Sequence, residues 1–120
     1  NKNNKIILLN CISSYPAKEE DLNLSLIPIL AKKYKCEVGY SGHESSVSPT
    51  IGACYMGAKF VERHITLDRA MWGTDQSASL SPDGLKNLVN MIRKITIIKG
   101  DGKKRILEDE KNKSKELRYW

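Results

Sequence analysis

Long apolar runs are absent from this sequence of 120 residues. No stretch of it approaches the roughly 18 apolar residues that a membrane-spanning helix needs, and residues 1–4 (NKNN) do not lead into the apolar core of a secretory leader. The composition, 40% apolar and 28% charged, is typical of a single globular domain rather than of a disordered chain. We therefore expect neither membrane insertion nor secretion.

Cysteine is scarce as well. Cys11, Cys36 and Cys54 are odd in number and form no CxxC pair, which argues against a disulfide framework and against a thiolate zinc site. We expect all three to be small core residues in a protein of the reducing cytoplasm. P-loops, GxGxxG turns and serine nucleophile elbows are also missing.

Acidic residues become sparse relative to basic ones toward the C-terminus. Residues 1–90 carry ten basic and nine acidic side chains, whereas residues 91–120 carry ten and five. A basic tail ending in Tyr119 and Trp120 could attract nucleic-acid phosphates, which gives one alternative function. Acidic residues interrupt that tail, however, and charge runs of this kind are usually solvated surface. We therefore expect residues 100–120 to be a polar linker that binds no nucleic acid.

Three short segments have the patterns of β-strands. Residues 5–11 form a nearly continuous apolar run, as in a strand that is buried on both faces of a parallel sheet. Residues 36–41 (CEVGYS) are predicted to be a second strand, and residues 59–66 alternate with period 2. Residues 13–17 after the first strand should form a loop, because Pro16 removes a backbone donor. The alternation places Glu62 and His64 on one face of the third strand.

Each predicted strand is followed by a segment with helical spacing of apolar residues. These helices are expected over residues 25–34, 47–56 and 82–98, with Ser25 as an N-cap and Gly57 as a terminator. Three successive strand-helix units imply a parallel sheet, of the doubly wound type or of the eight-stranded barrel type. Three units alone cannot close a barrel.

The two histidines follow equivalent positions, because His43 comes just after the second strand and His64 lies near the end of the third. In parallel α/β folds, functional groups gather at the carboxyl ends of the strands. A single histidine there is more often a hydrogen-bonded packing residue, but two that converge could hold a divalent metal ion.

Other polar residues lie at the same predicted edge. Ser13 and Ser41 could bind phosphate, although loop serines more often cap or turn the backbone. Tyr15 can equally be a packing residue, and Asp75 is either a substrate acceptor or a turn former. Spacing alone leaves these alternatives open.

Five blocks in order resemble the NeuB family of sialic acid synthases. They are residues 8–17 (LLNCISSYPA), 21–24 (DLNL), 38–44 (VGYSGHE), 57–68 (GAKFVERHITLD) and 73–82 (GTDQSASLSP). The resemblance implies an α/β fold, a partial (β/α)8 TIM barrel comprising about the last three βα units. Residues 1–99 would be the C-terminal portion of the barrel, and residues 100–120 a linker toward an antifreeze-like domain that this chain lacks.

The family resemblance also implies an activity. Members are metal-dependent transferases that condense phosphoenolpyruvate with N-acetylmannosamine, or its 6-phosphate, to give a sialic acid and phosphate. We expect the full-length protein to be a cytoplasmic homodimer. Synthases of pseudaminic and legionaminic acid share these blocks and remain the alternative.

Carried over residue by residue, the resemblance assigns roles at the predicted edge. His43 and His64 match the ligands of Mn2+ or Mg2+, Ser13 and Ser41 match phosphoenolpyruvate contacts, and Tyr15 and Asp75 match sugar contacts. No catalytic residue is assigned, because the family's phosphate-binding lysines and its proposed glutamate base match nothing in this chain. We therefore expect the chain alone to be inactive and to fold only when paired or in its full context.

The sequence departs from the family pattern at three positions near these residues. Gly42 stands where many bacterial members have Asp, Gln76 replaces a frequent His, and Ser81 replaces a common Glu. These departures could tune which sugar is accepted, and they leave the proposed metal ligands untouched.

Overall fold

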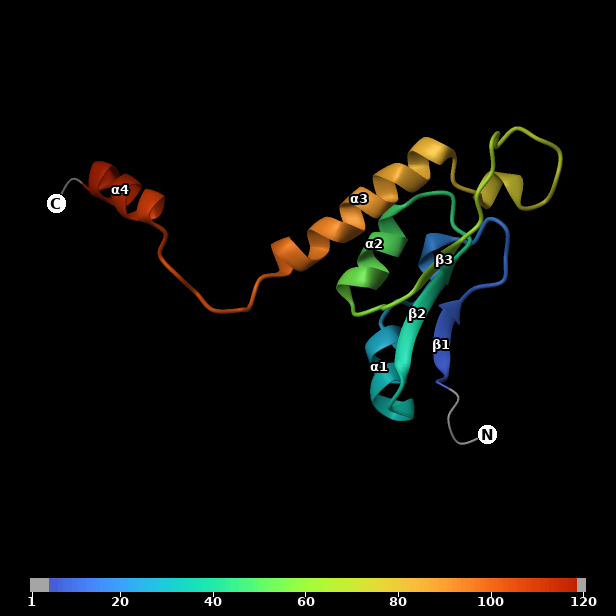
Figure 1. Ribbon diagram of the computed structural model, residues 1–120, viewed down its shortest axis with the longest axis horizontal. Helices are drawn as coiled ribbons and strands as arrows, with labels where there is room; N and C mark the ends of the chain where they lie inside the picture. The colour runs from blue at the N-terminus through green and yellow to red at the C-terminus, as the bar shows by residue number, and fades with distance from the viewer. Residues whose placement is uncertain (1–4, 119–120) are drawn as a thin grey trace.

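The structure is a computed structural model that describes residues 5–118. Its centre is a three-stranded parallel sheet in the order β1-β2-β3, formed by Ile7–Cys11, Glu37–Gly42 and Val61–Arg63 (Figure 1). The last register partners are Cys11 with Ser41 and Gly42 with Arg63. All three strands therefore end at the same edge of the sheet, which is the edge where the candidate site residues were expected.

Helices follow the strands in alternation, as the spacing of apolar residues predicts. Helices α1 (Leu26–Tyr34) and α2 (Ser48–Tyr55) pack on β2, and α3 (Pro82–Lys99) packs on α2. Two short 3-10 turns, η1 (Glu19–Asp21) and η2 (Gln76–Ala78), lie in the connecting loops. The last helix, α4 (Glu108–Leu117), is separated from the body by an extended segment (Figure 1).

The apolar core lies between β2 and the helices. Its buried members are Ile27, Val38, Tyr40 and Ala53, and partly buried side chains such as Leu8 and Leu30 pack against them. Burial of such side chains supplies most of the free energy that holds the helices on the sheet. The central strand β2 is consequently the rigid element to which the two other strands and two helices are attached.

The first strand does not have the two-sided burial that its sequence predicts. Ile7 and Leu9 remain more than a third exposed, and with Phe60 and Val61 they line an open groove. The reason is that β1 is an edge strand of this sheet, and the helices cover one of its faces only. The cysteine prediction is also wrong, since Cys11 is exposed and Cys36 and Cys54 are only partly buried.

Most predicted element boundaries agree with the structure to within two residues. The exception is the third strand, which spans residues 61–63 instead of 59–66. Its partner β2 ends at Gly42, and beyond that point Ile65 pairs with Leu80 in an isolated bridge. Ser25 occupies the N-cap of α1 but makes no capping hydrogen bond through its side chain.

The predicted linker contains a helix that apolar spacing could not reveal. Residues 100–107 have no regular secondary structure, but α4 follows with three acidic residues in its first turn and Lys115 in its last. This charge order interacts favourably with the helix macrodipole, and the helix has no buried residue. Tyr119 and Trp120, on which the nucleic-acid alternative depends, lie outside the described residues. None of the helices in residues 5–118 has the length and apolar character needed to cross a membrane.

Candidate functional site

His43 and His64 lie side by side at the carboxyl edge of the sheet. Each directly follows a member of the last register pair of β2 and β3, Gly42 with Arg63. Their ring centroids are 5.3 Å apart, with the ring planes inclined at 57°. Parallel pairing of two strands that end together thus produces the convergence expected from the sequence.

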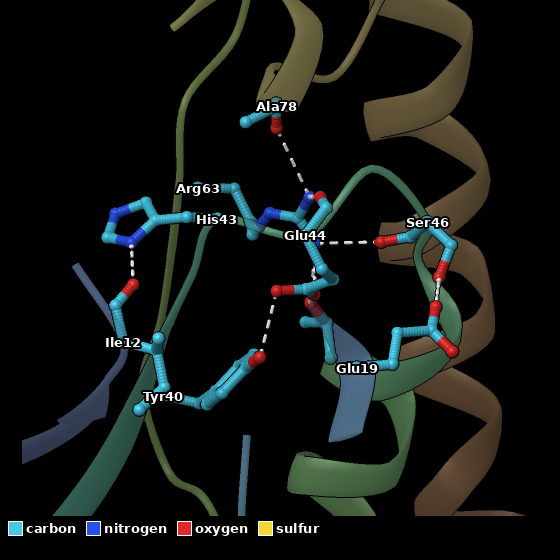
Figure 2. Close-up of polar contacts among 9 residues, drawn as sticks. Ile12, Glu19, Tyr40, His43, Glu44, Ser46, Arg63 and Ala78 are labelled. Carbon is cyan, nitrogen blue, oxygen red and sulfur yellow. Dashed lines mark hydrogen bonds and ion pairs between the residues drawn. The ribbon is translucent and has the colours of Figure 1, made fainter. Parts of the chain in front are cut away.

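The tautomer of His43 follows from its hydrogen bonds. Its Nδ1 lies 2.7 Å from the main-chain oxygen of Ile12, so Nδ1 carries the proton and donates it (Figure 2). Nε2 is then the ring nitrogen with the free lone pair, and it lies 3.2 Å from the Tyr15 hydroxyl. A carbonyl that fixes the far nitrogen in this way is the usual support for a metal-binding histidine.

Tyr15 contacts both histidines. Its ring centroid is 4.3 Å from that of His43 and 5.6 Å from that of His64, the second contact being edge-on. The loop that carries Tyr15 is attached to the strand end, because the Ala17 amide donates to the main-chain oxygen of His43 at 3.0 Å. Tyr15 therefore packs in the site itself, so the packing and site interpretations are compatible.

Asp75 reaches the site from the loop after β3. Its Oδ2 lies 3.8 Å from Nδ1 of His64, which places a carboxylate beside the second imidazole without a direct hydrogen bond. Its main-chain oxygen accepts from the amide of Ala78 and from the hydroxyl of Ser79. Asp75 thus combines the turn-forming and site-facing positions that the sequence left as alternatives.

The two serines differ in their environments. Ser41 is buried, and its Oγ donates to Oε1 of Glu62 at 2.7 Å, across the register pair of β2 and β3. Ser13 is exposed, and its Oγ lies 3.8 Å from the Cys11 sulfur, which in turn lies 4.0 Å from Nδ1 of His43. All six residues assigned from the sequence therefore belong to the same edge, where Glu62 and Cys11 join them.

A second polar cluster behind this edge was not anticipated. Glu44 and Arg63 form a buried ion pair at 2.6 Å, and the Glu44 carboxylate also accepts from the hydroxyls of Tyr40 and Thr50 at 2.8 and 2.9 Å (Figure 2). Burial, together with the hydrogen bond to Glu44, raises the pKa of Tyr40, and burial lowers the pKa of Arg63 against the opposing effect of Glu44. The sequence held a signal for this pair, since opposite charges flank the two histidines.

The donor set of the site fits part of a metal centre. Two imidazoles with a carboxylate nearby suit a divalent transition metal. Residues 5–118 contain no group of three or more His, Cys, Asp or Glu side chains arranged to hold a metal ion. This chain would therefore supply two protein ligands, and the other positions would fall to water, substrate or other residues.

Comparisons with known proteins show which family the chain resembles. The model of a family described as the NeuB family matches residues 1–104. The N,N'-diacetyllegionaminic acid synthase of Legionella pneumophila is 38% identical over 105 residues, 88% of this chain and 30% of that protein. Human N-acetylneuraminate-9-phosphate synthase is 40% identical over 109 residues, 90% of this chain and 30% of that protein.

A solved structure supports the same likeness. The N-acetylneuraminic acid (sialic acid) synthetase of Leptospira borgpetersenii, crystallised with citrate, aligns with a TM-score of 0.77 at 38% identity. The alignment covers 92% of this chain and 39% of that one. This chain thus spans only about a third of the length of these proteins.

Proposed function

The chain belongs to the NeuB family, and from that membership we propose that it contributes the metal-binding edge of a synthase that joins phosphoenolpyruvate to an N-acetylated aminosugar. The products would be a sialic acid and phosphate, with N-acetylmannosamine or its 6-phosphate as the sugar. The observation that carries the proposal is the 5.3 Å separation of the His43 and His64 rings at the carboxyl ends of adjacent parallel strands.

The proposal places these strands in a (β/α)8 barrel. An open sheet of three parallel strands with helices on one side has the local architecture of consecutive barrel units. The groove lined by Ile7, Leu9 and Val61 would then be covered by the interior of the barrel. In such barrels the carboxyl ends of the strands carry the active site, which agrees with the position of the two histidines.

His43 and His64 would hold Mn2+ or Mg2+, with Nε2 as the coordinating atom of His43. A cation bound there supplies Lewis-acid polarisation of the sugar aldehyde and stabilises the negative charge that develops on its oxygen. A coordinating imidazole must keep its lone pair, so we assign both histidines as ligands and not as proton carriers.

Tyr15 would help to orient the sugar. In this structure the Tyr15 hydroxyl is 3.2 Å from Nε2 of His43, so the hydroxyl points at the nitrogen that carries the free lone pair. If His43 held a cation through Nε2, the Tyr15 hydroxyl would lose this acceptor and would be available to a sugar oxygen. Asp75, beside His64, offers acceptor oxygens to sugar hydroxyls from the opposite loop.

Ser13 and Ser41 would bind phosphoenolpyruvate. The exposed Ser13 hydroxyl can donate to an anion directly. Ser41 has only one proton, which it donates to Glu62, so it can bind an anion only after that hydrogen bond is exchanged. Glu62 therefore competes with an incoming anion for the Ser41 hydroxyl proton.

Which N-acetylated aminosugar is the substrate is a separate question. A legionaminic acid synthase and a sialic acid phosphate synthase resemble the chain almost equally, at 38% and 40% identity. We propose the N-acetylmannosamine type, with the legionaminic and pseudaminic types as alternatives. Parallel assays with each sugar would decide between them by the ratio of kcat/KM values.

The test of the proposal is to replace each histidine in the intact protein. His43→Ala and His64→Ala should each weaken Mn2+ binding at least about 10-fold, because each removes a ligand, and each should reduce phosphate release from phosphoenolpyruvate and sugar. Binding is followed by Mn2+ electron paramagnetic resonance and release by a phosphate assay. Lys33→Ala, on the exposed side of α1, is the control. Unchanged Mn2+ binding in both histidine variants contradicts the proposal.

A further inference from the structure

A buried ion pair joins the two segments that carry the histidines. Glu44 directly follows His43, and Arg63 directly precedes His64. The Arg63 and Glu44 side chains are 2% and 0% exposed, and their closest nitrogen and oxygen atoms are 2.6 Å apart. The pair therefore connects the β2 and β3 segments at the point from which both imidazoles project.

The Arg63 guanidinium binds the backbone of the His43 segment as well as the Glu44 side chain. Its two terminal nitrogens donate to the main-chain oxygens of Glu44 and Ser46 at 2.5 and 3.1 Å, and one of them also reaches Ala78 in η2 at 3.4 Å. A planar group with donors in fixed directions can hold several acceptors at once. Arg63 thus fixes the direction in which the loop after β2 leaves the sheet.

These bonds begin where the strand pairing stops. Gly42 and Arg63 are the last register partners of β2 and β3. Other backbone bonds attach each histidine to a different segment: the main-chain oxygen of His43 accepts from Ala17, and that of His64 accepts from Leu80. Arg63 makes the hydrogen bonds that join the two histidine segments to each other beyond the last register pair. Among residues 5–118, these bonds go to the Glu44 side chain and to the main-chain oxygens of Glu44 and Ser46.

The pair lies on the opposite side of the strand ends from the imidazoles. Successive side chains of a strand point to opposite faces, so Arg63 points away from the face that carries Glu62 and His64. Figure 2 likewise shows the His43 ring directed toward Ile12 and away from the Glu44 carboxylate. A ligand between the imidazoles would not touch the pair, so any effect of the pair must pass through the histidines.

Gly42 provides the space that the pair occupies. A Cβ at this position would lie 2.8 Å from Oε2 of Glu44, 2.8 Å from the Tyr40 ring and 2.9 Å from Cδ of Arg63. The backbone of the last β2 residue therefore approaches the ion pair more closely than any other residue type would allow. The end of β2 and the ion pair are therefore closely packed.

We propose that the Glu44–Arg63 ion pair is a positioning element that sets the separation of the His43 and His64 imidazoles, and thereby the affinity of this histidine pair for a divalent cation. The inference rests on the proposed function, because it requires both histidines to hold the same cation. Groups that orient metal ligands without touching the metal commonly change metal affinity by about 10- to 100-fold when they are replaced.

The test is the variant Arg63→Lys in the intact protein. Lysine keeps the charge, but its single nitrogen cannot reach the Glu44 carboxylate and the main-chain oxygens of Glu44 and Ser46 together. We expect the dissociation constant for Mn2+, measured by electron paramagnetic resonance without substrates, to rise about 10-fold while the circular dichroism spectrum is retained. Glu44→Gln, which keeps the shape and removes the charge, should have the same effect. Arg93→Lys, on the exposed side of α3, is the matched control.

The outcomes separate this inference from the proposed function. If His43→Ala and His64→Ala abolish Mn2+ binding but folded Arg63→Lys and Glu44→Gln bind Mn2+ as the wild type does, the positioning role is wrong and the proposed function stands. If the histidine variants bind Mn2+ normally, the proposed function itself fails. Loss of the native fold in both conservative variants also overturns the inference, because the pair would then be a requirement for folding rather than for histidine spacing.

Discussion

At the scale of single residues, Gly42 shows why one position can matter without touching a ligand. Its conformation is not of the left-handed kind that favours glycine, so the requirement for glycine comes from space alone. Nearby, the Glu44 carboxylate, the Tyr40 ring and the Arg63 side chain leave no room for a Cβ. In this chain, glycine at position 42 therefore matters for the packing of the ion pair.

This predicts the effect of Gly42→Ala. The added methyl group must displace buried atoms, and overpacking of this kind costs about 1–3 kcal/mol of unfolding free energy. Denaturant unfolding of the intact protein measures the loss. Gly52→Ala is the matched control, since its nearest neighbour would be Cδ1 of Leu24 at 3.4 Å and alanine favours the helix in which it lies. Equal stability of the two alanine variants would refute the spatial explanation.

At the scale of elements, the start of α3 accounts for Ser81. Ser81 occupies the N-cap, its Oγ accepts from the Gly84 amide at 3.1 Å, and Pro82 follows in the first turn. The N-cap is a position where serine is strongly preferred and proline at the next position costs no hydrogen bond. A helix-capping role explains this serine without any contact to a sugar.

The cap can be tested with a pair of serines. Ser81→Ala should lower the unfolding free energy by about 0.5–2 kcal/mol, because the Gly84 amide loses its acceptor. Ser25 stands at the N-cap of α1 but makes no capping hydrogen bond with its side chain. Ser25→Ala should therefore change stability by less than about 0.5 kcal/mol. Thermal unfolding of the two variants of the intact protein checks the difference, and similar losses would show that the Ser81 cap contributes nothing specific.

At the scale of the whole molecule, the sheet leaves much apolar surface exposed. Ile7 and Leu9 are uncovered on β1, and Leu67, Ile97 and Ile98 are exposed elsewhere, Leu67 to 88%. Three parallel strands also leave unpaired strand edges at both sides. Parallel sheets are stable when both faces are covered, so this arrangement depends on further structure to cover the open face.

We therefore predict that the 120-residue chain on its own does not unfold cooperatively in dilute solution, and that it releases no phosphate when phosphoenolpyruvate, N-acetylmannosamine and Mn2+ are added. The chain should not unfold cooperatively because its small core cannot offset the conformational entropy of ordering the whole chain. It should release no phosphate because, by the family resemblance, the phosphate-binding lysines and the glutamate base match nothing in this chain. Thermal circular dichroism and a phosphate assay check the two parts. A sharp thermal transition of the monomer would contradict the first prediction. Sustained phosphate release would contradict the second. The homodimer and the cytoplasmic location stay predictions.

The linker at residues 100–120 and the antifreeze-like domain beyond it stay predictions as well. What the described part adds is α4, whose Glu and Lys residues form ion pairs three positions apart, Lys111 with Glu108 and Lys113 with Glu116. Such exposed pairs contribute little individually. The helix is thus supported by local charges and not by packing, which is why apolar spacing did not predict it.

The sequence by itself determined the strand-helix alternation, the parallel sheet and the positions of His43 and His64, because period and chain order dictate which side chains reach the same strand ends. The sequence did not predict which side chains are buried or which side chains contact one another. The exposure of Cys11, the shortening of the third strand and the Glu44–Arg63 pair depend on which segments meet in space. Only the tertiary structure decided these, since a contact between residues 19 positions apart is created by the pairing of β2 with β3 and by no local preference of either residue.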